Sequence, residues 1–167
     1  LIRPEYHTLM ECSPQKVNQV LLVGTYCGLN KGDRIMQTIA GKYLSSKGSY
    51  ITLATPFPEI DKHLYDGIDL VKSYRRNLPY SVIRSFFLFV LPKSLKSHSI
   101  RLDKEFNKYQ DSNLVIDLSG DMLTEDYGIH VGISHSFPLL TAILLNKKLA
   151  VIAQSIGPFN RLRAYYK

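Results

Sequence analysis

The sequence predicts an α/β fold, a Rossmann-like three-layer domain with a mostly parallel sheet. Two observations lead to this prediction. Short apolar segments of strand character alternate with helical patterns along the chain, and several of these strands end in glycine-rich or polar turns. Hydrophobic residues make up 45% of the 167 residues, which is enough for a packed core. Strands that alternate with helices favour a parallel sheet with right-handed crossovers.

The first expected unit is a strand, a glycine-rich loop and a helix. The apolar segment 17–23 is expected to be a buried strand that leads into the loop 24–33. Asp33 is available to the helix N-terminus, and Gly48 is placed to end the helix. The apolar residues that share one face of this helix are Ile35, Met36, Ile39, Ala40, Tyr43 and Leu44.

Further strands and helices follow in the same alternation. Strands are expected at 49–54, 68–71, 114–118 and 149–153. Helices are expected at 80–91, 99–109 and 139–144. The segment before the last of these helices is expected to be a loop that contains His130 and His135.

The expected domain organisation is an N-terminal extension, residues 1–16, followed by one Rossmann-like domain, residues 17–167. We expect this domain to be truncated and a second domain to be absent. The net charge is +7, and residues 72–108 carry nine basic and two acidic side chains, which accounts for the whole excess. This basic sector favours phosphate groups, anionic lipid or anionic sugar polymer, and a solvated surface explains it equally well.

The residue pattern disfavours several functional classes. Cys12 and Cys27 have no cysteine or histidine at metal-ligand spacing, so we expect no zinc site, no other metal site and no disulfide framework. The longest apolar run, 86–91, is short of the roughly 20 residues that cross a bilayer. The loop 24–33 lacks the dinucleotide-binding and Walker signatures, and Ser119 lacks the setting of a hydrolase nucleophile.

Three segments are expected to meet at the carboxyl edge of the sheet, where parallel sheets bind ligands. They are the loop 24–33, the turn 119–121 and the turn 154–159. The first offers closely approachable backbone and exposed amides at a helix start, which suit an anion or a hydroxyl-rich ligand. The second places carboxylates at the end of a strand, where burial can raise a pKa toward general acid or base duty.

The candidate site residues have structural alternatives that the sequence leaves open. The candidates for substrate binding are Gly28, Asn30, Gly32, Gly120, Gln154, Ser155 and Gly157. The candidates for catalysis are Asp33, which can equally be a helix cap, and Asp121, which can equally be a turn residue. For Asp117, His130 and His135 a structural or solvated role is favoured.

Three ordered motifs resemble the polysaccharide pyruvyl transferase family. They are Asn-x-Gly-Asp at 30–33, Leu-Val-Ile-x-x-Ser-Gly-x-x-Leu-x-x-Asp at 114–126 and Gln-Ser-Ile-Gly-Pro-Phe at 154–159. The resemblance covers about residues 17–167, and the third motif is its most specific part. The family usually has a run of glycines after the central strand, whereas this chain has Gly120 alone between Ser119 and Asp121.

The resemblance implies the first half of a two-domain protein with a GT-B-like fold and a ligand cleft between the domains. Members of the family transfer the pyruvyl group of phosphoenolpyruvate to two hydroxyls of a sugar, which forms a ketal and releases phosphate during assembly of a surface polysaccharide. The implied partner is a sugar or a lipid-linked oligosaccharide, and no cofactor is implied beyond phosphoenolpyruvate as donor. The groups that hold the donor would come mostly from the second domain, so the fragment alone is expected to be inactive.

Two other functions remain open from the sequence. A nucleotide-sugar glycosyltransferase domain would use the same architecture. A non-catalytic module would dock on an anionic membrane or a partner through residues 72–108. Nucleic acid is not an expected partner. The expected location is the cytoplasm, with a peripheral position at the inner face of the membrane.

Overall fold

Five strands form one sheet in the described part of the chain, in the order β3-β2-β1-β4-β5. The computed structural model describes residues 18–73, 104–124 and 126–153, together with positions 80, 83, 86, 87, 90 and 91. Every pair of neighbouring strands is parallel. The expected α/β, Rossmann-like fold is therefore confirmed, and the described sheet is entirely rather than mostly parallel.

Strands and helices alternate along the chain in the expected order. The strands are β1 (Gln19–Val23), β2 (Tyr50–Thr55), β3 (Asp69–Lys72), β4 (Leu114–Asp117) and β5 (Lys148–Val151). The helices are α1 (Lys31–Ser46), α2 (Pro58–Asp61), α5 (Lys104–Asp111) and α6 (Ile129–Leu144). Every expected strand is present, and each of its ends lies within two residues of the expected position.

Some expected segments lie outside the described residues. They are the N-terminal extension 1–16, the first residues of the helix expected at 99–109, and the turn 154–159. The helix expected at 80–91 is described only at isolated positions. The described part of the helix expected through Tyr109 is α5, in which Phe106 and Tyr109 are buried.

The expectation of a loop before the last helix is wrong. His130 and His135 lie within α6, which begins at Ile129. Glycine, serine and histidine are weaker helix formers than alanine or leucine, and they obscure the helical period in this segment of the sequence. Tertiary packing stabilises the helix instead, because Phe137 and Ala142 are buried.

Helix α1 buries only half of the apolar face that its sequence predicts. Ala40 and Leu44 pack against the core, and Met36 is half-buried. The three exposed side chains are Ile35, Ile39 and Tyr43. The six positions spread over about half of the circumference of the helix, which is wider than the arc that packs against one sheet.

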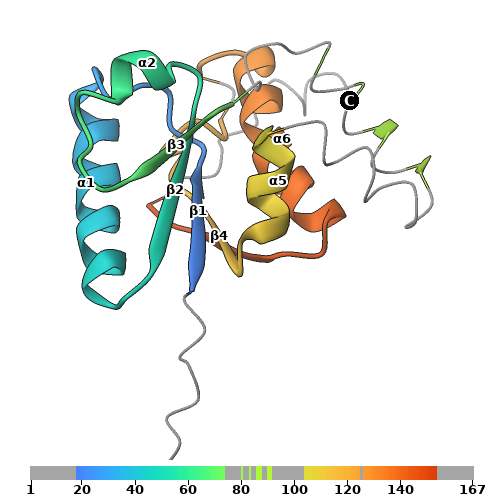
Figure 1. Cartoon of the computed structure of the whole chain (residues 1–167). Helices are drawn as coiled ribbons and strands as arrows, with labels where there is room; N and C mark the ends of the chain where they lie inside the picture. Colours follow the sequence, from blue (N-terminus) through green and yellow to red (C-terminus); the bar gives the residue numbers. More distant parts are fainter. Residues whose placement is uncertain are drawn as a thin grey trace, which may run out of the picture.

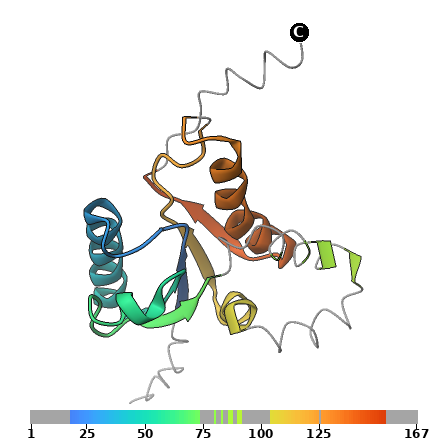
Figure 2. The same ribbon diagram turned by 90° about the horizontal axis from the view of Figure 1, so that it is seen from above.

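Helices cover both faces of the sheet. Helices α1 and α2 lie on one face and α5 and α6 on the other, as Figures 1 and 2 show. Side chains along β1 alternate between the two faces, as the period of a strand requires. Leu21 and Val23 join the core beneath α5 and α6, whereas Val20 and Leu22 join the core beneath α1.

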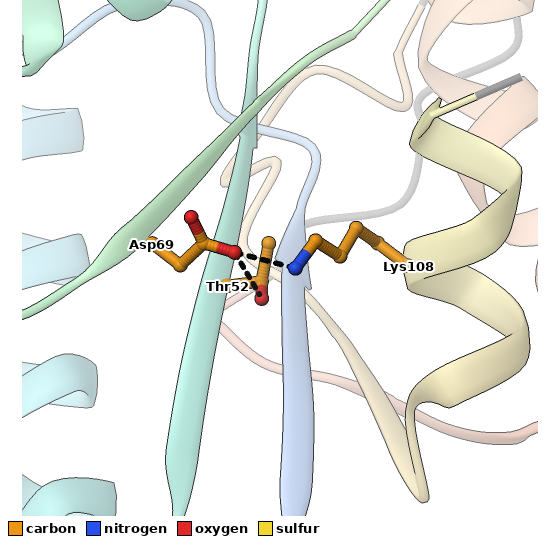
Figure 3. Close-up of polar contacts among 3 residues, drawn as sticks. All are labelled: Thr52, Asp69 and Lys108. Atoms are coloured by element: carbon orange, nitrogen blue, oxygen red, sulfur yellow. Dashed lines mark hydrogen bonds and ion pairs between the residues drawn. The ribbon is translucent and has the colours of Figure 1, made fainter.

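A polar contact ties α5 to the sheet (Figure 3). The ammonium group of Lys108 donates to Asp69 Oδ2 at 2.5 Å, and the hydroxyl of Thr52 donates to the same oxygen at 3.5 Å. The hydrogen bond to Asp69 is the main cause that raises the pKa of Lys108. Because both charged side chains are about one-third exposed, the pair contributes at most about 1 kcal/mol.

Candidate functional site

The site lies where the chain reverses direction across the sheet. From β1 the chain crosses one face to β2, and from β4 it crosses the other face to β5, while β1 and β4 are hydrogen-bonded neighbours. The loops after these two strands therefore part from each other at the carboxyl edge, where parallel sheets of this kind bind ligands in a crevice. Figure 2 looks onto this edge, with α1 and α6 on its two sides.

The ends of β1 and β4 touch at Gly24. This residue has a φ of 94°, and a Cβ placed on it would lie 1.8 Å from Asp117 Oδ1 and 2.4 Å from Ser119 Oγ. The Ser119 hydroxyl donates to Asp117 Oδ1 at 2.6 Å. The structure thus brings together the first two of the three expected segments. The third, with Gln154, Ser155 and Gly157, lies outside the described residues.

Asn30, and not Asp33, is the cap of α1. The side chain of Asn30 accepts from the amide of Gly32 at 3.0 Å. Asp33 instead reaches back to the loop, where its Oδ2 accepts from the amides of Tyr26 at 2.8 Å and Cys27 at 3.3 Å. At 8% exposure Asp33 is buried against the loop that it holds.

A second carboxylate, Asp61, holds the same loop from the end of α2. Its Oδ1 accepts from the amide of Gly28 at 2.8 Å and from the thiol of Cys27 at 3.8 Å, and its Oδ2 accepts from the hydroxyl of Thr55. Asp61 is completely buried. A Cβ on Gly28 would lie 2.8 Å from Asp61 Oδ1 and 2.7 Å from the hydroxyl of Tyr65, so any larger residue here would force these side chains to shift.

Sequence reasoning did not find Asp61. The available signal is its position six residues after Thr55, at the carboxyl edge where ligand sites form. Sequence reasoning also missed its neighbour Tyr65, because the contact of Tyr65 with Gln37 is distant in the chain. Burial, followed by the charge of Asp61, raises the pKa of the Tyr65 phenol well above its ordinary value, so this hydroxyl remains a neutral donor to Gln37.

The loop after β1 has few amides left for an anion. The amides of Tyr26, Cys27 and Gly28 donate to the two buried carboxylates, and that of Gly32 donates to Asn30. The next two amides of the loop donate to Cys27, at its thiol and its carbonyl oxygen. The amides of residues 26–30 and of Gly32 are therefore bonded within the protein, and among them the amide of Gly32 is the one at the helix start.

A buried hydroxyl adjoins this loop. Thr25 follows Gly24 directly, and its side chain is 1% exposed. Among the residues that the structure describes, Thr25 Oγ1 has no hydrogen-bond partner, and the same holds for Gln37 Nε2. A buried polar group without a partner costs about 1–3 kcal/mol, and such groups are satisfied by an ordered water or by a ligand.

The turn after β4 carries its polar groups on the surface. Asp121 is exposed, and its Oδ2 accepts from the phenol of Tyr127 at 2.8 Å. This hydrogen bond is the main cause that raises the pKa of Tyr127. Gly120 has a φ of 69°, and a Cβ on it would lie 3.7 Å from the methyl carbon of Met36, so the turn lies close to α1. Of the carboxylates expected at this turn, Asp117 is buried and Asp121 is not.

The described residues form neither a metal-binding cluster nor a membrane-spanning helix. Within residues 18–73, 104–124 and 126–153, no group of three or more His, Cys, Asp or Glu side chains is arranged to hold a metal ion. No helix in the same part of the chain has the length and apolar character needed to cross a membrane.

The candidate site at this edge combines a loop that is buried and tightly bonded with a turn that is exposed. The loop after β1 is held by the buried carboxylates of Asp33 and Asp61 and contains the buried hydroxyl of Thr25, whereas the turn after β4 exposes the pair formed by Asp121 and Tyr127. These groups accept and donate hydrogen bonds with hydroxyls, and they add no positive charge. No family model, no curated protein and no solved structure matches the chain.

Proposed function

We propose that this chain forms the acceptor-binding part of an enzyme that transfers a pyruvyl group from phosphoenolpyruvate to a sugar of a surface polysaccharide or its lipid-linked precursor. The observation that carries the proposal is the set of groups at the carboxyl edge, where the amides of residues 26–30 and Gly32 are bonded internally and the pair of Asp121 and Tyr127 is exposed. Such a set of groups suits a ligand rich in hydroxyls better than it suits a phosphate. The reaction would take place in the cytoplasm at the inner membrane face.

Asp33 and Asp121 are the proposed proton acceptors for the sugar hydroxyls. In the reaction, two hydroxyl oxygens bond to C2 of the enolpyruvyl group and the bond from C2 to the phosphate oxygen breaks. One hydroxyl proton ends on C3, which becomes a methyl group, and the other leaves with phosphate. Both loop amides bind Asp33 at Oδ2, so Oδ1 is the oxygen proposed to receive a proton.

The donor requires cations that the candidate residues do not supply. Phosphoenolpyruvate carries a carboxylate and a phosphate, and both bind best to arginine, lysine or protonated histidine. The candidates at the described edge are acidic or neutral, so the proposal places the donor against a second domain. Asn30 and Gly32 act in the first domain through the loop that they shape.

The nucleotide-sugar alternative has less support from the loop contacts. A nucleoside diphosphate is usually held by free amides of a glycine-rich loop and a helix start, and here the loop amides of Tyr26, Cys27 and Gly28 and the helix-start amide of Gly32 are already bonded. A glycosyltransferase remains the second candidate because it shares the fold.

Ligand binding by the 167-residue chain tests the proposal. Saturation-transfer NMR with a neutral oligosaccharide, phosphoenolpyruvate and a nucleotide sugar should show binding of the oligosaccharide, and Asp121→Asn should weaken it about tenfold through the loss of a charged acceptor. In the protein that carries the second domain, the same substitution should lower phosphate release about 100-fold.

A matched variant controls for the change of charge on the surface. Asp111 is another exposed aspartate, and it lies shortly before β4 begins, at the opposite edge of the sheet from Asp121. Asp111→Asn should therefore leave oligosaccharide binding unchanged. Binding of the nucleotide sugar without the oligosaccharide would contradict the proposal and favour the glycosyltransferase.

A further inference from the structure

The outer side of α1 carries a row of exposed apolar side chains. Ile35, Ile39 and Tyr43 are 59%, 64% and 61% exposed. They follow one another at intervals of four residues, so they stand along one face of the helix. In Figures 1 and 2, α1 forms an outer edge of the molecule. The row is therefore displayed on the surface of the molecule.

The charges around this row are basic. Lys31, Lys42 and Lys47 are exposed, and the ammonium group of Lys47 lies 5.8 Å from the centre of the Tyr43 ring. The acidic residue of the helix, Asp33, is buried and bonded to the loop. The outer side of α1 therefore combines an apolar row with a positive border.

A groove runs along one flank of the same helix. Its volume is about 570 Å³. Arg34 and Lys42 line it from α1, and Leu64 and Ile68 give it apolar surface on the other side. Asp66 lines it as well, so the groove places two cations and one carboxylate beside the apolar row.

We propose that this face of α1, defined by Ile35, Ile39, Tyr43 and their lysine border, docks on a bilayer that contains anionic phospholipid. Helices that lie in a membrane interface combine apolar side chains with lysines whose stems lie along the apolar surface. The groove would receive the phosphate of a headgroup between Arg34 and Lys42. This inference is independent of the proposed function.

The lysine border argues for lipid over protein. Lysine is depleted in protein interfaces, where arginine and aromatic residues are enriched. A second copy of the same face would bring one positive border against another, which opposes pairing. An anionic bilayer satisfies both the apolar row and the positive charges.

Vesicle flotation of the 167-residue chain tests the inference. The chain should bind vesicles of equimolar phosphatidylcholine and phosphatidylglycerol, and binding should fall as the ionic strength rises from about 0.1 M to about 1 M. Pure phosphatidylcholine vesicles should bind much less. The double variant Ile35→Ser/Ile39→Ser should weaken binding by about tenfold or more, and Lys42→Gln by about fivefold.

Matched variants separate this face from other surfaces. Ile143→Ser changes an equally exposed isoleucine on α6, so it should leave vesicle binding unchanged. Binding that survives in the Ile35→Ser/Ile39→Ser variant but is lost in Lys93→Gln/Lys96→Gln would overturn the proposal in favour of the basic sector 72–108. Light scattering that shows a dimer dissolved by Ile35→Ser/Ile39→Ser, with no vesicle binding, would overturn it in favour of self-association.

Discussion

The two loops that border the crevice are built in opposite ways. The loop after β1 is held by Asp33 and Asp61, two buried carboxylates that receive hydrogen bonds from successive amides. The turn after β4 ends in Asp121 and Tyr127, whose hydrogen bond is exposed to solvent. In the first loop the acidic groups determine the backbone conformation, whereas in the second the acid is left accessible to a ligand.

At this edge of the sheet the buried carboxylates stabilise the fold, whereas the exposed carboxylate is available for chemistry. A buried carboxylate with several donors is costly to disturb, because its loss leaves those donors unsatisfied. An exposed carboxylate with one partner contributes little to stability. Substitution of Asp61 should therefore act on folding, and substitution of Asp121 should act on function. Substitution of Asp33 should affect both, because its Oδ2 holds the loop and its Oδ1 is the proposed proton acceptor.

Replacement of a glycine by alanine in each loop gives the largest expected difference in the free energy of unfolding. Gly24 and Gly128 have similar φ values, 94° and 89°, but a Cβ on Gly24 meets Asp117 and Ser119 while a Cβ on Gly128 meets nothing within 4 Å. Gly24→Ala should lower the free energy of unfolding by about 3 kcal/mol, and Gly128→Ala by about 1 kcal/mol, the cost of backbone strain alone. Urea denaturation measures both. Equal losses would mean that Asp117 and Ser119 move aside freely.

Replacement of aspartate by asparagine at Asp61 and at Asp121 gives the next largest expected difference in stability. Asp61→Asn places an amide group among the donors from Gly28 and Thr55, so it should lower the free energy of unfolding by about 2 kcal/mol. Asp121→Asn should stay within about 0.5 kcal/mol of wild type. Chemical denaturation at neutral pH compares the two variants. An unchanged stability of Asp61→Asn would show that the loop does not depend on this carboxylate.

The smallest expected effect is a dependence of stability on pH, which tests the burial of Tyr65 beside the first loop. The pKa of Tyr65 is raised from 10.0 in the folded protein, mainly by burial, so the folded state retains a proton that the unfolded state loses. Stability from this group is complete below pH 10 and falls as the pH rises through and above that value. Tyr65→Phe should flatten this alkaline decline. Tyr43→Phe, at an exposed tyrosine, should leave the decline as in wild type.

Much of the fold could be predicted because it depends on local patterns. Each strand is a short apolar segment that ends in a polar or glycine-rich turn, and the alternation with helices implies a parallel sheet. The start of α6 could not be predicted, because its early turns contain weak helix formers. Which half of the apolar face of α1 is buried could not be read from spacing, since that depends on the width of the sheet beneath it.

The site was harder to predict from the sequence because the residues that contact one another are far apart in the chain. Asp61 binds the amide of Gly28 across 33 positions, and no local pattern connects them. The use of the loop amides by side chains depends on the folded positions of Asp33 and Asp61 and not on the glycines that suggested an open loop. The proximity of the loop 24–33 and the turn 119–121 could be expected, because parallel strands end at one edge.

The order of the strands also affects how the chain folds while it is synthesised. Beside β1, the amide of Gln19 donates to the side chain of Asn113, which is 94 positions away, and β4 pairs with β1 along its length. At synthesis rates of about 5–20 residues per second, one side of β1 stays unpaired for roughly 5–20 s while the intervening chain emerges from the ribosome. The strand at the centre of the finished sheet is thus an open edge during translation, exposed to aggregation and to chaperones.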